Sequence, residues 1–115
     1  MRASVRHFIS ADVDLDDFRP SDPEDFAFLI QALIGPSDGE GEESLQFVVC
    51  TPRNMERQVE REGGITWGRG LVIVNSPKMP KILDFLKRSI ERPERNSWSE
   101  LAAYLGKFGV IEFED

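Results

Sequence analysis

The chain has 115 residues, of which 40% are hydrophobic and 30% charged, and its formal net charge is −7. This length is typical of one domain, and the apolar content argues against a disordered chain. No stretch approaches the roughly 20 apolar residues of a membrane span, and residues 1–10 lack the apolar run of an export signal. We therefore expect a single domain over residues 1–115 that is cytoplasmic and does not contact a membrane.

The residue types needed for catalysis or metal binding are scarce. One cysteine cannot form an internal disulfide, and Cys50 and His7 alone cannot build a zinc cluster. Cys50 ends an apolar run, where cysteine usually behaves as a small hydrophobe, so a Cys–His nucleophile is disfavoured. The acidic run 12–17 lacks the central glycine and late glutamate of an EF-hand. We expect no metal, no cofactor and no enzyme activity, with a carboxylate-based hydrolase as a lesser alternative.

The negative charge is concentrated in a few segments. Residues 11–25 contain seven acids and one arginine, a net charge of −6, and residues 38–43 contain four acids and no base. Residues 52–95 are mildly basic, with ten bases and six acids. Nucleic acid is an unsuitable partner for such a surface, because phosphate binding needs an uncompensated basic patch. A basic protein is the better candidate, although solubility alone would also explain a negative net charge.

The first half of the chain predicts three strands. Residues 2–9 favour an edge strand, and residues 10–25, rich in Asp and Pro, favour a loop. Residues 26–35 are almost all apolar, which favours a strand buried on both faces over a helix. The β-branched and aromatic residues of 44–51 predict its antiparallel partner, so an acidic tip joins the two strands.

The next segment predicts a helix followed by a strand. Thr51 is expected to cap a short, mostly solvated helix that has Pro52 at its first position, continues through residues 53–62 and ends at two glycines. Residues 65–76 predict a strand whose buried half is 71–74. The glycines around Arg69 match neither a P-loop nor a dinucleotide fingerprint, and they favour a bulge or a sharp entry into this strand. We expect Arg69 to be exposed, with a structural role favoured over the binding of a carboxylate.

The last third predicts two amphipathic helices and a closing strand. The helix over residues 78–92 has an apolar face with a 3.6-residue period, formed by Met79, Ile82, Leu83, Phe85, Leu86 and Ile90. The helix over residues 97–109 begins with a Ser97–Glu100 capping box. Its expected inward stripe is Trp98, Leu101, Ala102, Leu105 and Phe108. Residues 110–115 predict a strand with Ile111 and Phe113 on one side.

These elements define an α+β fold, with a mostly antiparallel sheet and helices packed on one face. Their order along the chain is β-β-β-α-β-α-α-β. We find no internal repeat and no sign of a second domain.

Four motifs together resemble the immunity protein 8 family. They are G-P-x-x-x-x-G-x-E-S-x-x-F-V-V-C-T-P at 35–52, W-G-R-G-L-V-I-V at 67–74, S-W-S-E-L-A at 97–102 and E-F-E-D at 112–115. The resemblance covers the chain from about residue 26 to its end. It implies a cytosolic bacterial protein, encoded beside polymorphic toxins that include those delivered by contact. Such a protein binds a cognate toxin domain, blocks it and has no catalytic activity of its own.

A basic toxin domain, for example a nuclease, would be complementary to the two acidic segments. The expected toxin-binding residues are Asp12, Asp14, Asp16, Asp17 and Asp22 in the loop and Asp38, Glu40, Glu42 and Glu43 at the tip. The loop is the first choice for partner recognition. Glu43 also belongs to a shared motif and could serve the fold. An acidic adaptor that docks a basic protein without any toxin is the alternative.

Overall fold

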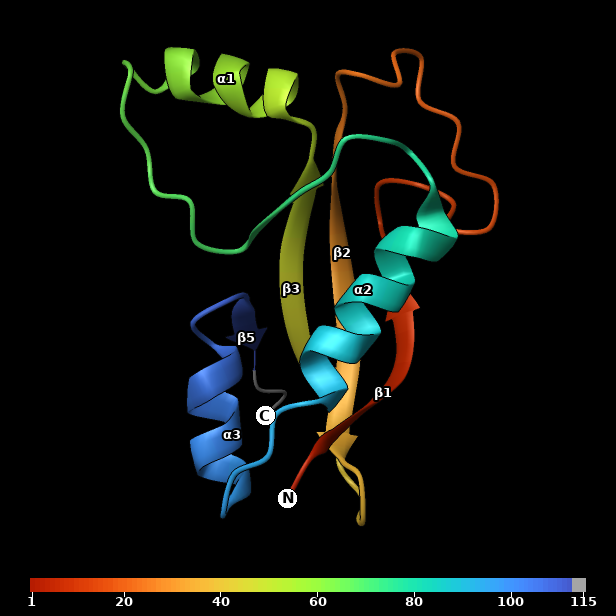
Figure 1. Cartoon of the computed structure of the whole chain (residues 1–115), viewed down its shortest axis with the longest axis vertical. Coiled ribbons are helices and arrows are strands. Elements are labelled where there is room, and N and C mark those ends of the chain that lie inside the picture. The colour runs from red at the N-terminus through yellow and green to blue at the C-terminus, as the bar shows by residue number, and fades with distance from the viewer. Residues whose placement is uncertain (113–115) are drawn as a thin grey trace.

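The structure, a computed structural model, describes residues 1–112 (Figure 1). Its elements are β1 (Ala3–Ile9), β2 (Ala27–Pro36), β3 (Glu43–Cys50), α1 (Pro52–Arg61), β4 (Leu71–Ile73), α2 (Met79–Glu91), α3 (Trp98–Leu105) and β5 (Val110–Glu112). The predicted order and the α+β class are confirmed. Within the described residues, no helix is long and apolar enough to cross a membrane.

The strands form one mixed five-stranded sheet. β1, β2 and β3 are joined by antiparallel pairing, so β1 is the edge strand that the sequence predicts. The far edge of β3 is divided between two short strands: β4 pairs with it in parallel and β5 in antiparallel fashion. The sheet is therefore mostly antiparallel, as predicted.

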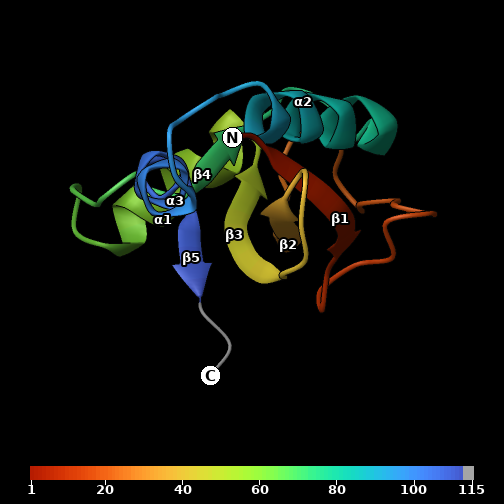
Figure 2. The same cartoon turned by 90° about the horizontal axis from the view of Figure 1, so that it is seen from below.

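Helices α2 and α3 lie on the same face of the sheet (Figure 2). Their buried residues, Met79, Ile82, Leu86, Ile90, Leu101 and Leu105, pack on the inward side chains of β2 and β3. On β2, Phe28, Ile30, Ala32 and Ile34 are buried, whereas Leu29, Gln31 and Leu33 are only half-buried. The prediction that this strand is buried on both faces is wrong, because the helices cover one face and side chains alternate between faces.

The predicted strand over residues 65–76 is much shorter in the structure, where only Leu71–Ile73 is extended and paired. Residues 62–70 form a loop, in which three glycines have positive φ angles: 83° at Gly63, 97° at Gly64 and 81° at Gly70. Those angles interrupt a regular strand. The run 71–74 is also less buried than predicted, because β4 is a short edge strand and Ile73 is 54% exposed.

Two predicted core phenylalanines are half exposed: Phe85 at 52% and Phe108 at 54%. Phe85 lies at the side of α2, next to the buried residues that face the sheet, and the sheet does not fully cover it. α3 ends at Leu105, so Phe108 lies in the turn that follows the helix. Phe113, expected in the closing strand, lies outside the described residues.

Both predicted helix caps are present. The Thr51 hydroxyl accepts a hydrogen bond from the Asn54 amide at 3.4 Å. The Ser97 hydroxyl accepts one from the Glu100 amide at 3.1 Å, and the Glu100 carboxylate accepts one from the amide of Asn96 at 3.3 Å. These contacts satisfy amides that have no partner inside the helices, which is why both helices begin where the sequence predicts.

The N-terminal strand is fastened to the end of α2 and the segment after it. A bulge between Val5 and His7 interrupts the pairing of β1 with β2. The Val5 amide donates instead to the Glu91 carboxylate at 2.8 Å. The terminal amine of Met1 donates to the Arg95 carbonyl at 2.8 Å, and the Arg95 amide returns a bond to Met1 at 3.0 Å.

Candidate protein-binding site

The acidic loop, residues 10–25, is shaped by its own carboxylates. Asp14 Oδ1 accepts a hydrogen bond from the Asp16 amide, and Asp22 Oδ1 accepts one from the Glu24 amide, each at 2.9 Å. These are Asx turns, which suit short acidic side chains. Asp12 Oδ2 accepts a bond from the Leu29 amide at 2.7 Å and so satisfies the β2 backbone.

Apolar side chains between the acids attach the loop to the core. Val13, Leu15 and Phe18 are partly buried against it. The Phe18 ring packs edge-on against Phe26 and Phe28, with ring centroids 5.2 and 4.9 Å apart. Because acidic and apolar residues alternate here, burying the apolar ones turns the acids toward solvent. All five candidate acids of the loop are exposed.

The tip of the β2–β3 hairpin, residues 37–42, is held by backbone contacts. Arg6 Nη2 donates to the Pro36 carbonyl at 2.9 Å and to the Gly39 carbonyl at 2.7 Å. A Cβ on Gly35 would lie 2.1 Å from the Gly41 carbonyl oxygen, so this close approach requires glycine. The three tip acids Asp38, Glu40 and Glu42 are exposed, and in the described part of the chain none forms an ion pair.

The ninth candidate acid, Glu43, is in a different environment. It is half-buried, and its Oε1 accepts a hydrogen bond from Trp98 Nε1 at 3.0 Å. Its other oxygen is buried and has no partner among residues 1–112. Glu43 therefore connects β3 to α3 and has a role in the fold.

The structure does not bring the two acidic sets together. The acidic loop lies at the end of β2 where the strand begins, and the tip lies where it ends (Figure 1). A strand of ten residues spans roughly 30 Å, so the two sets lie about that far apart. A partner that contacts one set closely is therefore far from the other.

Among residues 1–112, the most exposed large apolar side chains lie in a segment that the sequence predicts to be a strand. Ile65 is 85% exposed and Trp67 is 93% exposed, both in the loop over residues 62–70. The β-branched and aromatic run 65–67 favours a strand, which would have placed these residues in the sheet. The glycines on both sides are the signal for a loop.

Arg69, in the same loop, is exposed as predicted and has a structural role. Its Nε donates to the Gly106 carbonyl at 3.0 Å and its Nη2 to the Gly109 carbonyl at 3.4 Å. The side chain thus fastens the loop to the turn after α3, and its donors bind backbone carbonyls.

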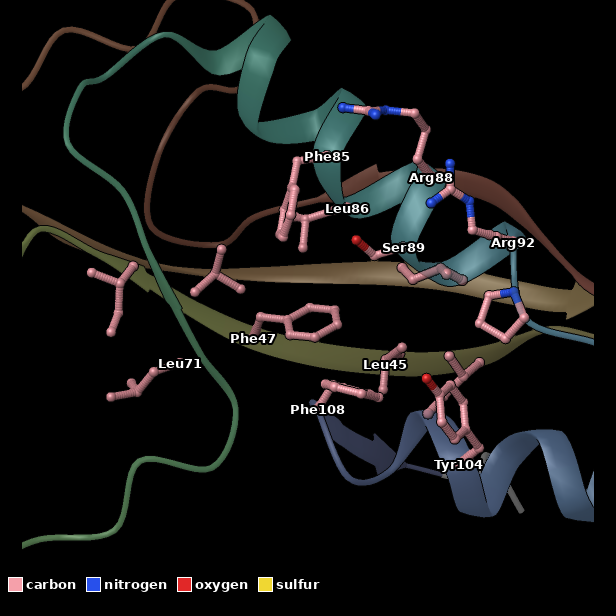
Figure 3. Close-up of a pocket in the computed structure, with 15 residues that line it drawn as sticks. Leu45, Phe47, Leu71, Phe85, Leu86, Arg88, Ser89, Arg92, Tyr104 and Phe108 are labelled. Carbon is pink, nitrogen blue, oxygen red and sulfur yellow. The ribbon is translucent and has the colours of Figure 1, made fainter.

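A hollow of about 520 Å³ lies between α2, α3 and β3 (Figure 3). Its wall is mainly apolar, with Leu45 and Phe47 from β3 and Phe108 from the turn after α3. Arg88 and Arg92 border it, but their side chains point away from the hollow (Figure 3). Among residues 1–112, its lining includes no carboxylate, histidine or cysteine.

His7 and Cys50 do not form a pair. His7 is exposed on β1, Cys50 is fully buried on β3, and β2 lies between these strands. Burial raises the pKa of the Cys50 thiol, which keeps it protonated and unreactive. Within residues 1–112, no group of three or more His, Cys, Asp or Glu side chains could hold a metal ion.

A comparison with known protein families matches residues 3–115 to the family described as Immunity protein 8. No curated protein and no solved structure matches the chain. The matched range includes β1 and the acidic loop, which extends the resemblance beyond the four motifs after residue 26.

Proposed function

Since the chain belongs to the immunity protein 8 family, we propose that it binds a cognate bacterial toxin domain and neutralises it by stoichiometric blocking through its acidic surface. The toxin belongs to a polymorphic system, such as contact-dependent inhibition, and the complex forms in the cytoplasm of the protected cell. The observation that carries this proposal, beside the family, is the set of exposed acids on the packed loop 10–25.

A fixed acidic loop has two physical consequences for a basic partner. Its field raises the rate of encounter, and complementary charges orient the partner as it approaches. The Asx turns engage one oxygen each of Asp14 and Asp22, so each carboxylate keeps a second oxygen to accept bonds from Lys or Arg. If the toxin is a nuclease, the same carboxylates occupy the surface that would hold substrate phosphates.

Co-expression tests this function directly. The toxin domain encoded next to this gene is induced in bacteria with and without the protein, and growth is followed. We expect rescue by this protein and none by an immunity protein that belongs to another toxin. Size-exclusion chromatography with light scattering should then give a 1:1 complex.

Growth arrest despite abundant soluble protein would contradict the proposal. A 1:1 complex in which the toxin keeps full activity would also contradict it, because blocking requires that activity be lost on binding.

A further inference from the structure

We infer that the cognate toxin docks on the face of the sheet that the helices leave uncovered, with the acidic loop at the rim of the contact. This open sheet face consists of three rows of side chains paired across the strands: Leu29, Val48 and Leu71; Ile9, Gln31, Gln46 and Val110; and His7, Leu33, Ser44 and Glu112. The inference rests on the proposed function and identifies the surface through which the toxin is bound.

The open sheet face lies on the side of the sheet opposite to α2 and α3. Among residues 1–112, no helix lies on this side of β1, β2 and β3 (Figure 2). Leu29, Leu33 and Val48 are half-buried by their neighbours in the sheet, but they do not pack against the hydrophobic core. Ile9 and Val110 are each 42% exposed. The isolated protein therefore leaves an apolar layer of the sheet in contact with water.

The composition of the open sheet face differs from that of a sheet face adapted to water. An antiparallel sheet with one solvated face normally places apolar residues inward and polar ones outward. Here the outward residues of β2 are Leu29, Gln31 and Leu33, and in the three rows only Glu112 carries a full charge at pH 7, although 30% of the chain is charged. Such depletion of charge is characteristic of the core of a protein interface. It also explains why the sequence of β2 predicts a strand buried on both faces, because a partner would cover the second one.

The acidic loop begins at the margin of the open sheet face. Ile9 is the last residue of β1, and the hydroxyl of Ser10 donates to the Leu29 carbonyl at 2.6 Å. Asp12 Oδ2 accepts a hydrogen bond from the amide of the same Leu29 at 2.7 Å. In Figure 2 the start of the loop lies below β1, on the side away from α2. A partner that covers Leu29 therefore also reaches the first carboxylates of the loop.

The size of the open sheet face fits the centre of an interface. Its strands β1, β2, β3 and β5, spaced about 4.8 Å apart and paired over roughly 20 Å, present roughly 400 Å². One partner contributes about 800 Å² to a stable protein interface of standard size. The acidic loop beside the face extends the contact as a charged rim around an apolar centre, which is the usual arrangement in such interfaces.

Charge decides which partner covers this face. Residues 1–50 form β1, β2, β3 and the loops that join them, and they contain eleven acids and three bases, a net charge of −8. Residues 51–115 contain ten acids and eleven bases. A symmetric contact with a second copy would bring two of these acidic halves together, whereas a basic toxin domain is attracted by them.

Substitution at the centre of the face tests the inference. Gln31→Lys and Gln31→Glu are prepared in the full chain, and their affinity for the toxin domain encoded beside this gene is measured by biolayer interferometry. We expect the Kd to rise roughly 50-fold for Gln31→Lys, because the contact would bury a positive charge against a basic partner, and only roughly fivefold for Gln31→Glu. Leu29→Ala removes an apolar contact and should raise the Kd roughly tenfold, mainly through faster dissociation.

Ser89→Lys is the matched control, because Ser89 is exposed on α2 and the substitution changes the net charge as Gln31→Lys does. Its effect on the Kd should be less than threefold. Ile9→Lys repeats the test at a position that is 42% exposed, where a lysine can reach solvent in the free protein, and the Kd should rise roughly tenfold. Thermal melting followed by circular dichroism verifies that each variant is folded.

The outcomes separate this inference from the proposed function. Wild-type binding together with Kd values for Gln31→Lys and Ile9→Lys no higher than that of Ser89→Lys would overturn the inference and leave the proposed function intact. A larger loss for Gln31→Glu than for Gln31→Lys would also overturn it, because the covering partner would then be acidic. A wild-type dimer that Gln31→Lys converts to a monomer would assign the face to self-association instead. Absence of wild-type binding would overturn both proposals.

Discussion

Glu42 and Glu43 are adjacent in sequence, yet the structure gives them different roles. Glu42 is exposed at the tip, whereas Glu43 is half-buried and accepts the indole hydrogen bond of Trp98. The two partners are 55 residues apart in sequence. No local sequence pattern reveals such a contact. From the sequence, Glu43 is therefore predicted to bind the toxin together with the acids of the tip.

Replacement of each glutamate by alanine separates these roles. Glu43→Ala leaves the Trp98 indole N–H unpaired, and we expect a loss of about 1–3 kcal/mol in unfolding free energy with toxin affinity unchanged. Glu42→Ala should leave stability within about 0.5 kcal/mol of wild type. Urea denaturation followed by tryptophan fluorescence measures both. Equal stability of the two variants would show that the Trp98 contact contributes nothing.

The burial of Cys50 predicts a dependence of stability on pH. Burial raises the pKa of its thiol above the ordinary value of 9.0. Above that pH the unfolded chain has released the thiol proton while the folded chain still holds it, so rising pH favours unfolding. The stabilisation that the buried thiol provides is present below about pH 9 and decreases as the pH rises above it. We expect the difference in unfolding free energy between wild type and Cys50→Ala to shrink as the pH rises above about 9 in urea titrations. A constant difference would contradict this expectation.

At the scale of elements, local chemistry decides which predictions hold. The two caps and the apolar periodicity of α2 are local signals, and they predicted helices that the structure contains. β4 is different, because the positive φ angles of Gly64 and Gly70 limit its extent, and the strand-like composition of residues 65–67 does not reveal them. The predicted apolar face of α2 included Phe85, which is half exposed. How much of a helix surface is buried depends on the sheet beneath it, and the sequence of the helix does not show this.

The acidic loop is an element without regular structure, and its order depends on Phe18. Phe18→Ala removes the aromatic contacts to Phe26 and Phe28, and we expect it to lower the unfolding free energy by about 2 kcal/mol. Hydrogen exchange of loop amides should become faster and toxin association slower, because the acids lose their fixed orientation. Phe108→Ala, a half-exposed phenylalanine after α3, is the control. Unchanged exchange in the loop would mean that the Asx turns alone maintain it.

At the scale of the whole molecule, the two acidic sets can be tested separately. Their separation of roughly 30 Å is several times the Debye length of about 8 Å at physiological salt. A partner bound at one end of the sheet therefore interacts only weakly with the acids at the other end. Asn retains the turn-forming oxygen of Asp14, which allows its charge to be removed without breaking the loop.

The triple variant Asp14→Asn, Asp16→Asn and Asp17→Asn should slow toxin association about tenfold at low salt and weaken its dependence on salt. The matched tip variant, Asp38→Asn, Glu40→Gln and Glu42→Gln, changes the net charge equally and should alter the association rate less than twofold. Stopped-flow measurements at several salt concentrations distinguish the two. A larger effect of the tip variant would place the toxin at the opposite end of the sheet.

Whole-molecule properties were the least accessible to prediction from sequence. The positions of the acids along the chain are evident, but their separation to opposite ends of β2 follows from strand pairing. The exposure of Trp67 was missed for a related reason: residues 65–67 have strand-like composition, and only the path set by Gly64, Gly70 and Arg69 places them outside the sheet.

The contacts that fasten the N-terminus to the end of α2 and to Arg95 also affect the timing of folding. Met1 meets Arg95 and Val5 meets Glu91, across sequence separations of 94 and 86 residues. During synthesis the β2–β3 hairpin can pair before β1 is fastened, because Met1 and Val5 must wait for residues 91–95. A growing chain therefore holds an incompletely fastened edge strand until those residues have been made and α2 has packed on the sheet.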